Sequence, residues 1–90
     1  MNIQRKIVVR GKVQGVGFRN ATWRKAMELG IRGSVRNLDD GSVEILASAT
    51  DKEFIIFENW CREGPPHARG DPLEISELDQ TGFTGFSIDD

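Results

Sequence analysis

The 90-residue sequence contains one cysteine, one histidine and no tyrosine. A single cysteine cannot form a disulfide within the chain, and one cysteine with one histidine cannot supply the ligands of a Cys/His zinc cluster. We therefore expect no metal ion and no cofactor, and we expect Cys61 to be a core residue rather than a reactive thiol. An unpaired cysteine also favours a reducing compartment.

Long apolar runs are also missing. The run from Phe54 to Phe57 is four residues long, whereas a membrane-spanning helix needs about 20. The first six residues, Met-Asn-Ile-Gln-Arg-Lys, lack the apolar stretch of a secretory signal. These absences predict a soluble, cytoplasmic protein with no membrane partner.

The chain has no overall excess of positive charge. Its net charge of −2 does not favour binding of nucleic acid through bulk charge. The charges are nevertheless unevenly distributed, at +5 over residues 1–45 and −7 over residues 46–90. In a compact domain this split can create a local positive field that attracts a small anion. Two differently solvated faces are the alternative interpretation.

The pattern of apolar residues predicts seven elements in one domain, residues 1–90. β-branched and alternating residues indicate strands near 5–13, 31–37, 42–48, 73–78 and 83–88. Helical spacing indicates a helix at 20–29 and a second from the Thr50–Glu53 capping box to the stop at residues 64–66. Right-handed crossovers then place both helices on one face of a mainly antiparallel sheet. We expect an α+β sandwich of order βαββαβ with an extra C-terminal strand, its other sheet face largely open to solvent.

Residues 14–19, Gln-Gly-Val-Gly-Phe-Arg, connect the first predicted strand to the first helix. Gly15 and Gly17 can adopt positive φ and turn their N–H groups toward an anion, and a helix N-terminus adds the positive end of its dipole. Arg19 in the first helical turn opposes that dipole. A bound anion would reverse the penalty, since the guanidinium and the loop N–H groups could share its oxygens. A glycine turn followed by an exposed arginine is the alternative.

Two segments resemble the signatures of the acylphosphatase family. Residues 11–19 are similar to Gly-x-Val-Gln-Gly-Val-x-Phe-Arg, and residues 33–44 (GSVRNLDDGSVE) resemble the second signature, in order and at the family's spacing. Gly64-Pro65-Pro66 and Gly85-Phe86-x-Ile88 extend the resemblance over essentially the whole chain. The family's ferredoxin-like sandwich agrees with the expected architecture. Asn20 and Ser34 depart from the usual residues at non-catalytic positions, so we expect them to affect rate and stability more than function.

The resemblance implies metal-independent hydrolysis of acyl phosphates to a carboxylate and inorganic phosphate. Arg19 and Asn37 would be the catalytic residues, with Arg19 stabilising the phosphoryl charge and Asn37 orienting the attacking water. The substrate's own phosphate would act as the base. The phosphate-binding loop would comprise Gln14, Gly15, Val16, Gly17, Phe18 and Arg19. Within it, Gln14 and Phe18 are expected to serve as loop support and core packing rather than as direct ligands. The expected partners are a small acyl phosphate and inorganic phosphate, which is both product and competitive ligand, and the protein is expected to be a monomer.

Two other functions fit the same architecture. An RNA-binding module is disfavoured, because the phenylalanines of residues 82–88 lie three apart on the last strand and no Lys or Arg precedes their glycine. An acylphosphatase-like module for the carbamoyl phosphate chemistry of hydrogenase maturation proteins would head a much longer chain, so a length of 90 residues favours the free enzyme.

Three further titratable residues are expected to have structural roles. His67 could be proposed as a general base, but the motif supplies no role for it, and we expect an exposed loop residue. Asp39 and Asp40 could suggest a metal site. Adjacent acids before Gly41 are more typical of a solvated hairpin turn.

Overall fold

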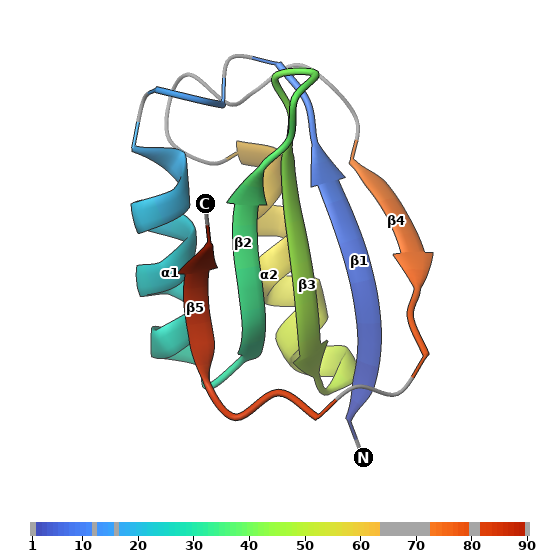
Figure 1. Ribbon diagram of the computed structural model, residues 1–90. Helices are drawn as coiled ribbons and strands as arrows, with labels where there is room; N and C mark the ends of the chain where they lie inside the picture. Colours follow the sequence, from blue (N-terminus) through green and yellow to red (C-terminus); the bar gives the residue numbers. More distant parts are fainter. Residues whose placement is uncertain (1, 12, 16, 64–72, 80–81, 90) are drawn as a thin grey trace.

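The computed structural model describes residues 2–11, 13–15, 17–63, 73–79 and 82–89. Five strands and two helices follow one another along these residues (Figure 1). They are β1 (Ile3–Val9), α1 (Phe18–Leu29), β2 (Arg32–Asn37), β3 (Val43–Ala49), α2 (Asp51–Glu63), β4 (Glu74–Glu77) and β5 (Phe86–Asp89). The predicted order, including the extra C-terminal strand, is confirmed. Neither described helix has the length and apolar character needed to cross a membrane.

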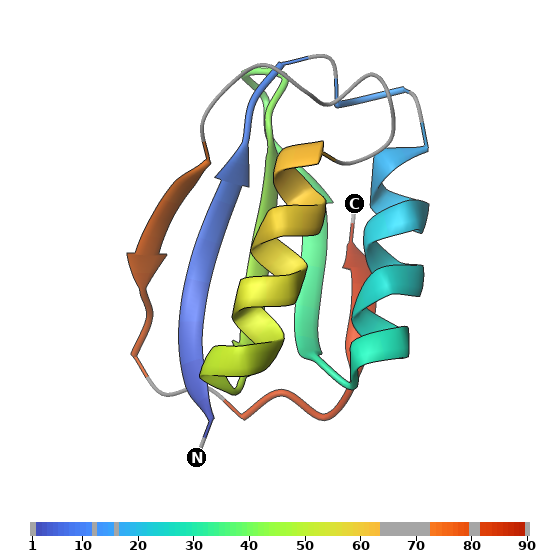
Figure 2. The ribbon, with the colours of Figure 1, turned by 180° about the vertical axis from the view of Figure 1, so that it is seen from behind.

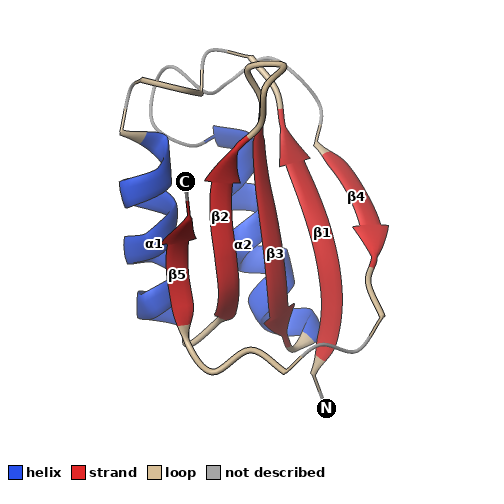
Figure 3. Cartoon of the chain, in the orientation of Figure 1, coloured by secondary structure: helices blue, strands red, loops and turns tan. Residues whose placement is uncertain are grey.

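The strands form one sheet in the order β4-β1-β3-β2-β5. β1 pairs antiparallel with β3 and β4, β2 pairs antiparallel with β3, and β5 pairs parallel with β2. Figure 2 shows α1 and α2 side by side on one face of the sheet, and Figure 3 shows the same two layers by element type. The α+β, ferredoxin-like sandwich expected from the sequence is therefore confirmed.

The hydrophobic core lies between the sheet and the two helices. Phe18 of α1 and Phe54 and Phe57 of α2 are at most 1% exposed. Removal of each such side chain from water contributes about 1.5–3 kcal/mol. Cys61 is fully buried beside them, as predicted, and burial raises the pKa of its thiol, with the Glu58 charge adding to the effect.

The predicted end of the first strand is wrong. β1 ends at Val9 rather than at residue 13, because Gly11 has a φ of 103° that extended strands do not adopt. Val13 is only 1% exposed, but it lies in the connection, where its N–H donates to the Gly11 carbonyl at 3.0 Å. A buried β-branched residue in a loop therefore produced the strand-like pattern.

The helix boundaries follow from local capping. α1 begins at Phe18, two residues before the predicted start, because Gly17 serves as its N-cap at a φ of 80°. Gly30 ends the helix in the same left-handed region, as predicted. At α2 the capping box is confirmed, since Thr50 N–H donates to Glu53 Oε1 at 2.8 Å and Glu53 N–H donates to Thr50 Oγ1 at 3.2 Å.

The sheet face opposite the helices differs from the expected open surface. No described helix covers this face (Figure 1), yet Val8, Glu44 and Ser48 on it are 7–8% exposed. Arg36 Nε donates to Glu44 Oε1 at 2.9 Å, and Lys6 Nζ lies 4.0 Å from Glu44 Oε2. Long side chains of neighbouring strands therefore cover the centre of a face that is otherwise polar.

Candidate active site

The connection between β1 and α1 forms a glycine cradle. Gly15 and Gly17 have φ values of 76° and 80°, and a Cβ built on either would meet no atom within 4 Å. Space therefore lies in front of both main-chain positions. Gly17 caps α1 without any side-chain hydrogen bond, and the first turn contains no acidic residue. The N–H groups and dipole at this helix end therefore favour an anion.

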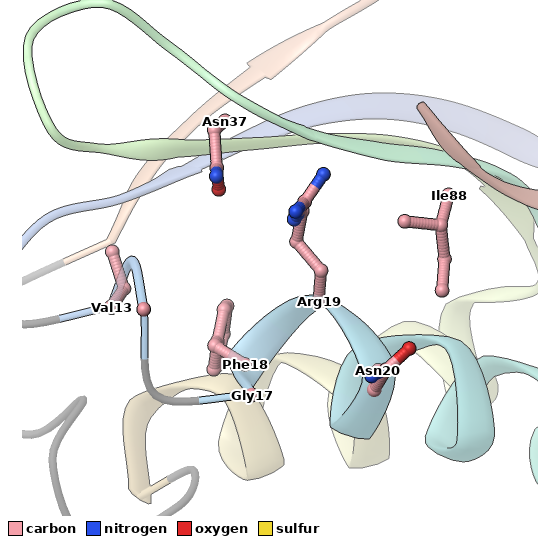
Figure 4. Close-up of a pocket in the computed structure, with 8 residues that line it drawn as sticks. Val13, Gly17, Phe18, Arg19, Asn20, Asn37 and Ile88 are labelled. Carbon is pink, nitrogen blue, oxygen red and sulfur yellow. The ribbon is translucent and has the colours of Figure 1, made fainter. Parts of the chain in front are cut away.

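Arg19 extends from the first turn of α1 into the space between Asn37 and Ile88 (Figure 4). Its Nη1 donates to the main-chain carbonyl of Asp89 at 3.0 Å. The last strand thus helps to hold the guanidinium, and Ile88 from the same strand lines the pocket beside it. A planar guanidinium in this position can bind two oxygens of a phosphoryl group.

Asn37 ends β2, and its side chain points into the same space (Figure 4). Its Oδ1 is buried and accepts no hydrogen bond from the part of the chain that the structure describes. A buried acceptor without a partner costs about 1–3 kcal/mol, and a bound molecule is one common reason for such an atom. The amide is therefore placed to bind a molecule that enters the pocket.

These side chains line one pocket of about 130 Å³. Its lining consists of Val13, Gly15, Gly17, Phe18, Arg19, Asn20, Asn37 and Ile88. Five of the residues predicted for the site are thus brought together from segments far apart in the sequence. The predicted loop residue Val16 lies outside the described residues.

Gln14 lies beside the pocket and joins the cradle to the β2–β3 hairpin. Its Nε2 donates to the carbonyl of Leu38 at 2.7 Å and to that of Ser42 at 2.8 Å. Phe18 is 1% exposed and stacks on Trp60, with ring centroids 5.7 Å apart. These contacts agree with the support and packing expected for Gln14 and Phe18.

The hairpin turn is itself fixed by a charge cluster. Arg10 donates to Asp40 Oδ2 at 2.9 Å and also to the carboxylate of Glu74. Asp40 accepts hydrogen bonds from the hydroxyl and N–H of Ser42. These two bonds, followed by the contact with Arg10, lower the pKa of Asp40 to about 2. The ends of β1, β2, β3 and β4 are thereby tied together beside the site.

The acidic turn has the arrangement expected of a solvated hairpin. Gly41 adopts a φ of 93°, and Asp39 and Asp40 are exposed. Within the described ranges, no three His, Cys, Asp or Glu side chains gather as metal ligands would. His67 lies outside those ranges.

The sequence did not reveal the contribution of β5 to the site. The Asp89 carbonyl contacts Arg19, and the Phe86 carbonyl accepts a hydrogen bond from Trp23 Nε1 at 3.0 Å. Main-chain carbonyls have no side-chain signature. Only the pairing of β5 with β2 could have suggested that they lie beside α1.

The fold and the pocket together define a small α+β sandwich with a glycine-rich connection between β1 and α1 that lines the pocket. The acylphosphatase family model matches residues 5–88. An acylphosphatase of Mannheimia succiniciproducens is 45% identical over 86 residues, which cover 96% of this chain and 93% of that protein. The chain therefore belongs to the acylphosphatase family, and it is a hydrolase of small acyl phosphates.

Solved structures agree with this assignment. The acylphosphatase of Bacillus subtilis is 36% identical, with a TM-score of 0.89 and 98% of each chain covered. That of Coxiella burnetii is 34% identical, with a TM-score of 0.90, and the match covers 98% of this chain and 93% of that one. The similarity thus extends over the whole sandwich.

Proposed function

We propose that the pocket between the glycine cradle, Arg19 and Asn37 hydrolyses acyl phosphates without a metal ion. The observation that carries the proposal is the convergence of three groups on one pocket: backbone positions with positive φ, a guanidinium and a buried amide. The cradle and Arg19 supply the positive potential that a phosphoryl group needs. Phosphoryl transfer depends mainly on such positioning and electrostatics.

In this mechanism a water oxygen attacks phosphorus in line with the bond to the acyl oxygen. Asn37 orients the water through its amide, and Arg19 stabilises the charge on the phosphoryl oxygens. The new P–O bond forms while the bond to the acyl oxygen breaks, so the acyl group leaves as a carboxylate. The water proton passes to a phosphate oxygen of the substrate, so no protein side chain has to act as the base.

The proposal extends to the setting of the enzyme. Inorganic phosphate, the product, is expected to compete with the substrate for the cradle. We propose that residues 1–90 act as one domain, as a monomer in the cytoplasm, with no nucleic-acid or membrane partner. Support comes from the single sheet and core, the unpaired Cys61 and the net charge of −2.

Substitution of Arg19 tests the mechanism. Hydrolysis of acetyl phosphate by the parent should persist in excess EDTA. Arg19→Ala should lower kcat/KM by about 10²-fold or more, as for the loss of one transition-state donor. Arg19→Lys should restore little, because an ammonium group lacks the planar fork.

Each result has a counterpart that contradicts the proposal. Loss of activity on chelation would exclude the metal-free mechanism. A near-normal kcat/KM for Arg19→Ala would show that Arg19 has no catalytic role. Unfolding is separated from catalysis by recording the thermal unfolding curve of each variant.

A further inference from the structure

A second hollow, the α1 groove, adjoins the catalytic pocket. Its volume is about 390 Å³, and its lining includes Arg24 and Lys25 of α1 and Trp60 of α2. It shares Gly17 and Asn20 with the catalytic pocket. The two hollows therefore adjoin each other at the first turn of α1.

The α1 groove carries a cation that is available to a ligand. Lys25 Nζ lies 3.0 Å from Glu28 Oε2, so these two lining charges neutralise each other. Arg24 is exposed and forms no ion pair with any residue that the structure describes. The groove therefore offers one guanidinium to an anionic group.

Helix geometry places this guanidinium near the junction of the two hollows. Arg24 follows Asn20 by four residues, a separation of about 6 Å along the helix axis. Side chains of a helix lean toward its N-terminus, so the Arg24 side chain covers the turn on the Asn20 side. With C–C bonds of about 1.5 Å, a four-carbon diacid carries its second carboxylate about 4 Å beyond the first carbonyl carbon. A substrate of that length can reach Arg24 from the cradle.

The direction of the reaction also points to this groove. In-line attack requires the acyl oxygen to depart on the side opposite the water. Asn37 and Asn20 lie on opposite sides of the Arg19 side chain (Figure 4). If Asn37 holds the water, the acyl group leaves toward Asn20, where the α1 groove begins.

From these relationships we infer that the α1 groove is the acyl subsite and that Arg24 is a specificity-determining residue. The preferred substrates are acyl phosphates whose acyl chain ends in a second carboxylate. The inference rests on the proposed function, because it takes the direction of attack from it. The inference names the group that the enzyme would recognise at the end of the substrate that the cradle does not contact, namely a second carboxylate.

Two substrates of equal chain length test the inference. Succinyl phosphate has a terminal carboxylate, and butyryl phosphate has a methyl group in its place. The readout is the ratio of their kcat/KM values for the parent, Arg24→Ala and Arg24→Glu. The matched control is Arg32→Glu, which changes the same charge at an exposed arginine of β2 that lines neither hollow.

The parent should favour succinyl phosphate. Arg24→Ala should lower the ratio about 1.5-fold to fivefold, the range of an exposed ion pair. Arg24→Glu should lower it further, and Arg32→Glu should leave it near the parent value. Raised salt should reduce the preference of the parent, because exposed charges are screened.

The possible failures are distinguishable. An equal ratio in the parent and Arg24→Glu, or an equal change in Arg32→Glu, would overturn the subsite while leaving acyl phosphate hydrolysis in place. A folded parent that hydrolyses neither compound would overturn the proposed function, and the subsite with it. Inhibition of acetyl phosphate hydrolysis by succinyl phosphonate relative to butyryl phosphonate gives a second, binding-based ratio, which should change in the same direction.

Discussion

Gln14 Nε2 lies 2.7 Å from the carbonyl oxygen of Leu38, the residue that follows Asn37. Because the same nitrogen also donates to Ser42, one amide joins the glycine cradle to both sides of the β2–β3 turn. The proposed phosphate-binding end of the site and the proposed water-binding end are therefore connected by one side chain.

Replacement of Gln14 tests this connection. Gln14→Ala removes both hydrogen bonds and should lower kcat about tenfold to a hundredfold, since small displacements of reacting groups cost that much. Each lost bond should also reduce the free energy of unfolding by about 0.5–1.5 kcal/mol. Acetyl phosphate kinetics and urea unfolding measure the two effects. Unchanged kcat with reduced stability would limit Gln14 to a structural role.

Asn37 should affect turnover more than phosphate affinity. Asn37→Ala should lower kcat about 10²-fold while changing the inhibition constant of inorganic phosphate much less, because the cradle and Arg19 remain. The isosteric Asn37→Asp should lower both, since it places a negative charge beside the phosphoryl oxygens. The measurement is acetyl phosphate hydrolysis with phosphate as competitor. Equal losses of kcat and phosphate affinity in Asn37→Ala would contradict a water-orienting role.

Gly33 should tolerate no side chain. A Cβ at this position would lie 1.8 Å from the main-chain oxygen of Leu46. The φ of Gly33 is 150°, which is in the region that favours glycine. Gly33→Ala should therefore destabilise the protein by more than about 4 kcal/mol or prevent folding. Gly82→Ala is the control, since a Cβ there meets nothing within 4 Å. Circular dichroism and thermal unfolding measure the effect. A native-like melting curve for Gly33→Ala would contradict the close packing of Gly33 against the main chain of Leu46.

Asp40 should make stability depend on pH under acidic conditions. Its pKa is lowered from 3.8 to about 2 in the folded protein, mainly by hydrogen bonds from Ser42 and then by Arg10. A carboxyl with a lowered folded pKa stabilises the fold above its unfolded pKa and loses this contribution as the pH falls through the folded value. The free energy of unfolding should thus decrease between about pH 5 and pH 2, and less steeply in Asp40→Asn.

Urea unfolding at a series of pH values measures this slope. Asp39→Asn is the matched control, because the neighbouring Asp39 forms no hydrogen bond or ion pair with the described residues. The control should keep the slope of the parent. If Asp40→Asn also kept it, the Arg10–Asp40–Ser42 cluster would have no part in acid stability.

The sequence predicted the residues that line the pocket better than the contacts around them. Arg19 and Asn37 could be selected because each stands in a signature at fixed spacing, and the positive φ values of Gly15 and Gly17 follow from residue type. The contact between Arg19 and Asp89 could not be predicted, because a main-chain carbonyl is present at every position.

The fold was predictable where local chemistry decides it. The Thr50–Glu53 box placed the start of α2 within one residue, since its two hydrogen bonds form within one turn. The end of β1 was misplaced, because the φ of Gly11 rather than the burial of Val13 decides where the strand stops. The parallel pairing of β5 with β2 depends on tertiary contacts that no local pattern contains.

That pairing bears on how the enzyme acquires activity during folding. Gly33 pairs with Phe86, and Arg36 with Asp89, so the paired residues are 53 positions apart in the sequence. The contact between Arg19 and the Asp89 carbonyl forms only after these partners have met. Closing so large a loop is entropically costly, and sheets rich in such distant pairs fold slowly. A chain with β1, β2 and β3 already paired would still lack the contact between Arg19 and Asp89. The return of acyl phosphate hydrolysis after dilution from denaturant would therefore follow the docking of the last strand.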